Sequence, residues 1–202
     1  MIPRFVSSKE AAYLIQDNST VANVSMTMIG CAEEIYKELE KRFIKDNHPT
    51  NLTLFHPAGF TDRKEGIEHL AHEGLLKKIV GSHWGLAPKI MKLINDCKVE
   101  AYCMPFGVLC NMFQDMCKKT PGSISKIGLH TFLDPRYEGG QMNEISTEEM
   151  VSLLELNGEE CLIYKHVPID FLIIRGTYAD ENGNISIKDE PLLLENLSAA
   201  LA

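Results

Sequence analysis

The segment that decides the fold runs Lys78-Ile-Val-Gly-Ser-His-Trp-Gly-Leu-Ala-Pro-Lys-Ile-Met-Lys-Leu-Ile-Asn95 and is followed by Val99-Glu-Ala-Tyr102. Lys78-Ile-Val80 is short and apolar, as is typical of a buried strand, and a loop with two glycines follows it. Leu86 to Asn95 predicts a helix, and Val99 to Tyr102 predicts the next strand. This strand-helix-strand order indicates a parallel sheet.

The same alternation extends on both sides of this segment. It predicts strands at residues 20–26 and 51–55 and helices at about 7–16, 31–44, 66–73 and 107–118. We therefore expect an α/β fold, an open, mainly parallel sheet flanked by helices. After Pro121 the chain changes to Gly- and Pro-rich loops with extra β segments. Here the pattern predicts strands at 161–164 and 170–174, a short helix opened by the capping box Ser146-Thr-Glu-Glu149, and a last helix at 195–202.

Composition limits the class of protein and its partners. The 202 residues, of which 45% are hydrophobic and 24% charged, suit one globular domain. A net charge of -8 repels nucleic acid and anionic membranes, so neither is expected as a partner. Without a long apolar run or a signal-peptide core, a cytoplasmic location is expected. The six cysteines form no CxxC pair, which favours free thiols in a reducing compartment.

Ligands of parallel sheets bind where the strands end and the loops begin. Those positions are residues 27–30, 56–60, 81–85 and 104–107. The loop Gly81-Ser-His-Trp-Gly85 is the best local candidate, because its backbone amides are suited to an anion. The alternative is a plain turn in which Trp84 anchors the core.

Other chemistries have weaker support. His69 and His72 suggest zinc, but their i, i+3 spacing differs from the metalloprotease helix and the sequence shows no third ligand, so no metal site is expected. There is no GxSxG elbow for a serine hydrolase and no GxGxxG turn for a dinucleotide.

A polar loop stands out in Gly128-Leu-His-Thr-Phe-Leu-Asp-Pro-Arg-Tyr-Glu-Gly-Gly-Gln-Met-Asn143, where a strand-like apolar lead precedes charged residues and paired glycines. Asp134, Arg136 and Glu138 favour a structural, ion-paired loop. Arg136 binding a substrate carboxylate or another subunit is the alternative.

Several stretches together resemble the family I coenzyme A transferases, in particular the N-terminal (α-type) half of the acetate, propionate or 3-oxoacid enzymes. The likeness is collinear over almost the whole chain, in residues 51–59, 70–75, 81–89, 100–108, 121–143 and 175–185.

The resemblance implies that residues 1–202 form a single α-type domain that lacks the β-type catalytic half. Such enzymes move CoA between a short-chain acyl-CoA and a carboxylic acid, in short-chain fatty acid and ketone body metabolism, through a glutamyl-CoA thioester. The glutamate belongs to the β-type half, so no catalytic residue is assigned in this chain. No cofactor is expected, because coenzyme A is the substrate, and the chain is expected to form a homo- or hetero-oligomer with a β-type domain or subunit.

The chain departs from the family pattern near the expected site. The family's Gly-Gly-Phe turn and the Gly-x-Pro after it correspond to Ser25-Met-Thr27 and Gly30-Cys-Ala32, and the family's Pro-Gln-Gly corresponds to Pro105-Phe106-Gly107. These changes indicate an altered site, or a catalytically inactive binding or assembly domain. The residues expected to bind substrate or CoA are Ser25, Met26, Gly30, Gly81, Ser82, His83, Phe106 and Gly107.

Overall fold

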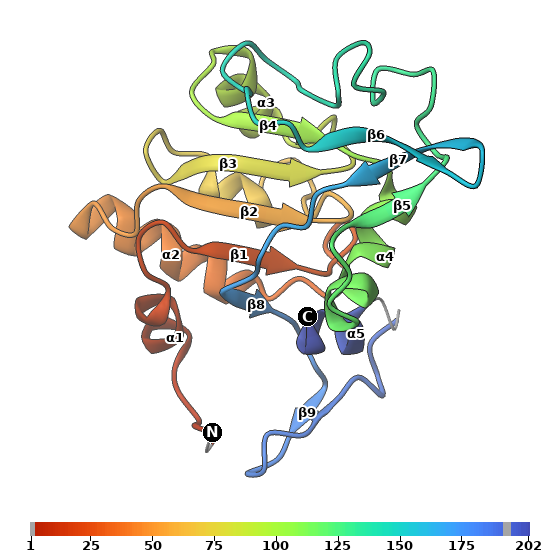
Figure 1. Cartoon of the computed structure of the whole chain (residues 1–202). Helices are drawn as coiled ribbons and strands as arrows, with labels where there is room; N and C mark the ends of the chain where they lie inside the picture. The colour runs from red at the N-terminus through yellow and green to blue at the C-terminus, as the bar shows by residue number, and fades with distance from the viewer. Residues whose placement is uncertain (1–2, 192–194) are drawn as a thin grey trace.

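The computed structural model describes residues 3–191 and 195–202. A five-stranded sheet in the order β4-β3-β2-β1-β8 lies at its centre, and every pairing in it is parallel (Figure 1). The first four strands follow one another in chain order, and β8 returns to pair with β1. The expected α/β class is confirmed by the strands β1 (Thr20–Asn23), β2 (Leu52–His56), β3 (Leu76–Gly81), β4 (Glu100–Cys103) and β8 (Phe171–Ile173).

Helices connect these strands, as the alternation predicts. Ser7 and Glu10 cap the first helix through a reciprocal pair of hydrogen bonds. The helix expected at 66–73 is instead a short 3₁₀ segment that ends at Leu70. The elements are α1 (Ser8–Leu14), α2 (Glu33–Asp46), η1 (Gly66–Leu70), α3 (Pro88–Asn95), α4 (Phe106–Cys117) and α5 (Asn196–Leu201).

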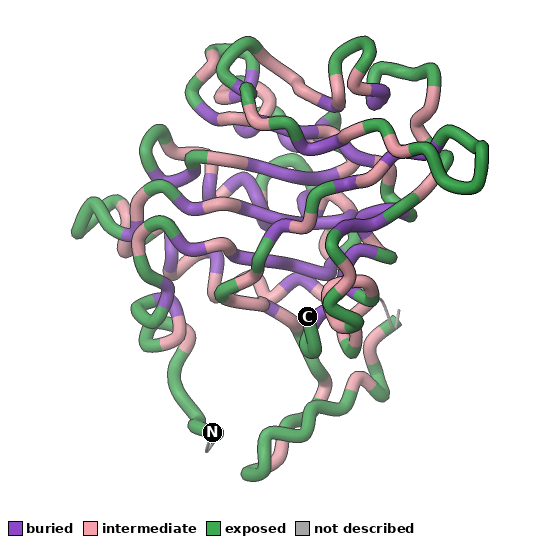
Figure 2. The backbone as a smooth tube through the Cα atoms, in the orientation of Figure 1, coloured by how far each residue is buried: buried purple, intermediate pink, exposed green. Residues whose placement is uncertain are grey.

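Side chains alternate across the sheet and build two cores. Val21, Leu54 and Ile79 pack with α1, α2 and α3 on one face. Their chain neighbours Ala22 and Phe55 pack on the other face, with α4 and the second sheet. Successive residues of a strand point to opposite faces, which is why these strands read as continuous apolar runs. Figure 2 shows the central strands buried along most of their length.

The C-terminal third carries the expected extra β segments. An antiparallel sheet has the order β5-β7-β6, and a two-stranded ribbon, β9 with β10, extends away from the body with both strands exposed (Figures 1 and 2). These strands are β5 (Ser123–Ser125), β6 (Val151–Leu156), β7 (Glu159–Tyr164), β9 (Tyr178–Ala179) and β10 (Ile185–Ser186).

The prediction of a helix from the capping box at 146–149 is wrong, because the structure has no helix there. The groups that would cap it are used by β4 instead. The Ser146 hydroxyl accepts a 2.8 Å hydrogen bond from the Ala101 amide, and the Glu148 amide donates to the Tyr102 hydroxyl at 2.9 Å. The segment therefore runs irregularly to β6, because tertiary partners compete successfully for the local capping groups.

The Gly128–Asn143 loop covers the edge of β4. It has no strand at its start and consists of successive turns. The Cys103 amide donates to Gly140 O at 2.8 Å, and the Met142 amide donates to Ala101 O at 2.9 Å. Asp134 is fully buried and accepts hydrogen bonds from the His130 and Arg136 amides and from the Arg136 guanidinium. These contacts agree with the structural, ion-paired interpretation of the loop.

The cysteines and the length of the helices were also subjects of sequence expectations. All six cysteines are free thiols; Cys31 and Cys161 are buried and the others are half-buried. Within residues 3–191 and 195–202, no helix has both the length and the apolar character needed to cross a membrane.

Candidate functional site

An open, mainly apolar hollow lies where β1, β2 and β3 end and α4 begins. Its volume is about 240 Å³. Most of its lining is apolar and comes from the loops after β1, β2 and β3 and from the first residue of α4. The lining residues are Met26, Thr27, Ala58, Gly59, Ser82, His83, Leu86 and Phe106. Four of the predicted site residues, Met26, Ser82, His83 and Phe106, therefore meet at one place.

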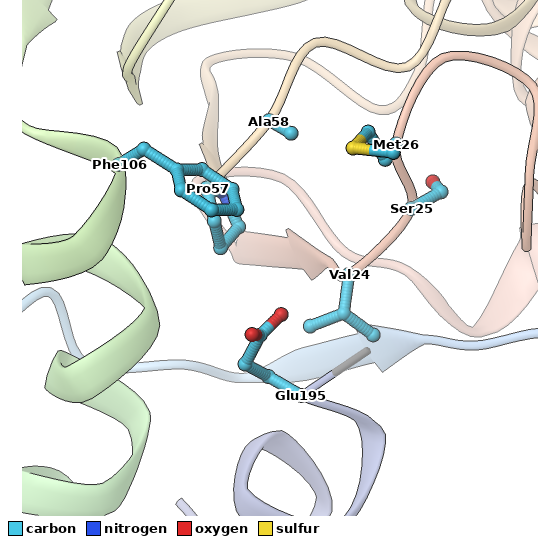
Figure 3. Close-up of a pocket in the computed structure, with 7 residues that line it drawn as sticks. All are labelled: Val24, Ser25, Met26, Pro57, Ala58, Phe106 and Glu195. Atoms are coloured by element: carbon cyan, nitrogen blue, oxygen red, sulfur yellow. The ribbon is translucent and has the colours of Figure 1, made fainter. Parts of the chain in front are cut away.

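Met26 and Phe106 dominate the opening of this hollow. They are apolar, yet their exposed fractions are 38% and 48%. Both also line a much smaller adjoining hollow, and Figure 3 shows them on either side of it with Ala58 between them. Two exposed apolar side chains that face one space are suited to a ligand's apolar part.

The loop after β1 turns tightly between Met26 and Ile29, whose backbones exchange hydrogen bonds of 3.1 and 3.0 Å. Thr27 occupies the left-handed region with φ 52°, and Gly30 follows with φ 71°. The Thr27 amide donates to Gly59 O at 2.8 Å, which ties this turn to the loop after β2. A β-branched residue is strained at positive φ, so glycine would suit position 27 of this turn better than threonine.

Ser25 is placed differently from the expectation. It lines the small hollow but is only 2% exposed. Its amide donates to Asn23 Oδ1 at 2.7 Å, and its hydroxyl donates to the same oxygen. The Ser25 hydroxyl thus binds the side chain at the end of β1, and Ser25 does not line the hollow of about 240 Å³.

The Gly81–Gly85 loop packs against the core at its first residue. A Cβ on Gly81 would lie 2.7 Å from His56 Cε1 and 2.9 Å from the Trp84 ring, so glycine is required there by ring packing. Trp84 is 3% exposed and acts as the anchor considered above. The Ser82 hydroxyl donates to Pro57 O, and His83 stays exposed at the rim. Only Ser82 and His83 of this loop's predicted site residues line the hollow.

His56 is a buried residue within the strand-end positions 56–60, but sequence reasoning did not name it as a site residue. Its Nδ1 lies 2.9 Å from Ala58 O, so Nδ1 carries the proton and donates. Its Nε2 is buried and has no hydrogen-bond partner within the described residues. Burial lowers the pKa of His56 to about 4, which keeps the ring neutral. The available signal was a histidine at the carboxyl end of a strand, directly before Pro57.

The N-terminus of α4 borders the hollow at Phe106. Pro105 at the N-cap offers no side-chain acceptor, so no side chain caps the first amides of the helix. Such amides carry partial positive charge and favour anions. Gly107 lies in this turn with no atom within 4 Å of a built Cβ, and it lines a separate, polar hollow of about 380 Å³ beside Asn111.

Of the described residues that line the two adjoining hollows, Glu195, in the C-terminal segment, is the one that carries a carboxylate. Glu195 lines the small hollow, with its carboxylate directed toward it in Figure 3. Burial, and secondarily Glu195, raise the pKa of the neighbouring Cys110 thiol to about 12. None of the eight residues that line the apolar hollow of about 240 Å³ carries a carboxylate.

The histidine pair at 69 and 72 has more partners than the sequence indicates. His69 Nε2 lies 2.7 Å from Glu33 and 2.9 Å from Glu65, and both histidines contact Glu40. The ligand atoms of Glu33, Glu65 and His69 lie close enough together to hold a metal ion, but His72 is not part of this group. Burial lowers the pKa of His69, but these carboxylates outweigh it and raise the pKa, which favours an ion-paired imidazolium.

Comparisons with known proteins agree on one family. The family model described as "Coenzyme A transferase" matches residues 5–202. The chain is 42% identical to caffeate CoA-transferase of Acetobacterium woodii over 200 residues, and 35% identical to acetate CoA-transferase YdiF of Escherichia coli K12 over 206 residues. Each alignment covers 98% of this chain but only 38% of the relative's length.

Solved structures give the same result. The apoenzyme of acyl-CoA transferase YdiF from Escherichia coli O157:H7 superposes with a TM-score of 0.95 at 35% identity, covering 100% of this chain and 39% of that one. Glutaconate coenzyme A-transferase from Acidaminococcus fermentans shares the fold, with a TM-score of 0.75 at 15% identity, over 98% of this chain and 63% of its own. From its sequence and its fold, the chain belongs to the coenzyme A transferase family.

Proposed function

We propose that this chain is the α-type part of a CoA-transferase that moves CoA between a short-chain acyl-CoA and a carboxylic acid. A β-type half, as a further domain or a separate subunit, supplies the nucleophilic glutamate. Two facts support this proposal: the chain spans about two fifths of the relatives' length, and no carboxylate lines the hollow of about 240 Å³ that holds Met26, Leu86 and Phe106. The absence of a carboxylate among those lining residues is the observation that carries the proposal.

The proposed reaction proceeds in two balanced steps. The glutamate oxygen attacks the thioester carbonyl, a C–O bond forms, the C–S bond breaks, and a mixed anhydride and CoA thiolate result. The thiolate then attacks the glutamyl carbonyl, which releases the first carboxylate and leaves a glutamyl-CoA thioester. The incoming acid reverses both steps.

This chain's residues supply binding and orientation in that scheme. Met26, Leu86 and Phe106 form the apolar wall against which the acyl group lies. The uncapped amides at the start of α4 face the developing negative charge. Chemistry that needs a carboxylate nucleophile is left to the β-type half.

Reconstitution tests the proposal. The chain assembled with the β-type half from its own source should exchange CoA between acetyl-CoA and an added carboxylic acid, whereas either part alone should not. Full exchange by the 202-residue chain alone, or none by the assembled protein with any acid, would contradict it.

A second candidate is a catalytically inactive binding or assembly domain. The strained Thr27, and Met26 and Phe106 at positions where the family has glycine and glutamine, favour it. The double variant Met26→Gly, Phe106→Gln in the assembled protein separates the two. If both the parent and this restored variant fold, assemble and remain inactive, the chain is a binding domain.

A further inference from the structure

We infer that the hollow bounded by Met26, Leu86 and Phe106 is an acyl subsite for an aryl-substituted short-chain acid, such as 3-phenylpropanoate, in preference to acetate. The inference rests on the proposed function and names the substrate class of the same site. Three observations carry it: the apolar side chains, the size of the hollow, and the internal pairing of its hydroxyl groups.

The first observation is the character of the walls. A thioether, a leucine side chain and a phenyl ring converge on the hollow from the β1 loop, the β3 loop and the start of α4. The thioether of Met26 is polarisable and contacts aromatic rings favourably, and Phe106 offers an aromatic partner. Exposing two such groups to water costs free energy that an apolar ligand recovers on binding.

The second observation is size. The hollow measures about 240 Å³. A cavity of about 150 Å³ with apolar walls is enough to bind benzene. The hollow therefore has room for a phenyl ring and a two-carbon link to the carboxylate. An acetyl methyl group would leave most of this apolar wall in contact with water.

The third observation is that the two hydroxyls in the lining are already used. Thr27 Oγ1 donates to Met26 O at 2.6 Å, and the Ser82 hydroxyl donates to Pro57 O. Neither is positioned to reward a polar substituent on the acyl chain. The amides that begin α4 lie beside Phe106, so a carboxylate held there would leave the ring of the ligand against the apolar walls.

Competition between two acids tests the inference in the assembled protein. With acetyl-CoA as the donor, kcat/KM for 3-phenylpropanoate should exceed kcat/KM for propionate by about tenfold or more, from the additional apolar burial. Phe106→Gln, which installs the family's residue, should reduce that ratio about tenfold. The matched control Phe106→Leu keeps an apolar side chain and should retain most of the preference.

The outcomes separate this inference from the proposed function. Exchange that favours propionate, or a preference that Phe106→Gln leaves unchanged, overturns the acyl subsite and leaves the CoA-transferase intact. If no carboxylic acid is a substrate, the proposed function fails, and ¹³C-methyl methionine NMR of the chain decides the subsite. A shift of the Met26 signal, assigned through Met26→Leu, by 3-phenylpropanoate and not by propionate supports it; no shift overturns it.

Discussion

Two loops, one along the edge of β4 and one at the carboxyl end of β1, meet the same backbone requirement in opposite ways. In the Gly128–Asn143 loop, positive φ angles fall on Gly128, Gly139 and Gly140 and, at 61°, on His130, whose Cβ is not branched. In the turn after β1, a φ of 52° falls on Thr27. The first loop satisfies its local demands and covers the edge of β4, whereas the second tolerates strain beside the candidate site. Strain of this kind gathers at functional sites.

The two regions also differ in how they hold a buried polar group. Asp134 is surrounded by donors, and hydrogen bonds from Arg136 hold the pKa of its carboxyl well below the usual range. Buried His56, next to the site, has a hydrogen-bond partner at Nδ1 but none at Nε2 among the residues that the structure describes. The buried carboxylate of the structural loop is thus held by hydrogen bonds, whereas one ring nitrogen of the buried histidine beside the site lacks a hydrogen bond.

The largest effect is expected from removing a required glycine. A Cβ on Gly140 would lie 2.5 Å from Cys103 O, at a φ of 77°. Gly140→Ala should lower the free energy of unfolding by about 3–4 kcal/mol, from backbone strain and the clash together. Urea denaturation measures this, with Gly158→Ala, which has positive φ but no atom within 4 Å, as the matched control. Equal losses in both variants would show that the contact with β4 adds nothing.

The next effect is a pH dependence of stability that His56 controls. Its pKa is about 4 in the folded protein against about 6.5 when unfolded, so the unfolded chain binds more protons between these values. Stability should therefore fall as the pH drops from about 6.5 to 4, by about 3 kcal/mol. His56→Asn keeps a donor for Ala58 O and should flatten this part of the profile. An unchanged slope in the variant would assign the acid sensitivity to other groups.

A smaller effect of opposite sign is expected at Thr27. Thr27→Gly should raise the free energy of unfolding by about 1 kcal/mol, because relief of the positive φ exceeds the entropic cost of glycine. Thr27→Ser, which keeps the hydroxyl and removes only the branch, serves as the control and should gain less. Destabilisation by glycine would mean that the turn is not strained.

The smallest effect is expected at Glu138. It lies in the Gly128–Asn143 loop but is exposed, and its backbone carbonyl accepts a 3.1 Å hydrogen bond from the Gln141 amide. Glu138→Ala should change the unfolding free energy by less than about 0.5 kcal/mol. In the assembled protein it should also leave CoA exchange unchanged, since the loop is structural. A loss of exchange beyond tenfold, with stability unchanged, would move this glutamate into the site.

Local sequence signals predict the central sheet well and the long-range contacts poorly. The apolar runs at 52–56 and 78–80 identify β2 and β3 because both faces of these strands are buried. Nothing local indicates that β8 returns to pair with β1, some 150 residues earlier. The capping box at Ser146 misleads for the same reason, because Ala101 is its partner.

The site could be predicted in part for similar reasons. Ser82 and His83 were expected from their position after a strand, and Met26 and Phe106 from the family resemblance, and the four do meet. Gly30 and Ser25 serve the turn and the end of β1, and Gly81 gives room to His56. Two of the carboxylates around His69, those of Glu33 and Glu40, come from α2, so the spacing of the histidines alone could not indicate them. The third, that of Glu65, lies four residues before His69.

The central claim is that the reacting carboxylate lies outside these 202 residues. Its most direct test is to incubate the assembled protein with acetyl-CoA and to locate the covalent CoA adduct by peptide mass spectrometry. The account predicts a glutamyl-CoA thioester on a peptide of the β-type half, with peptides of this chain unmodified. An adduct on Glu195, Glu138 or any other carboxylate of this chain would contradict it.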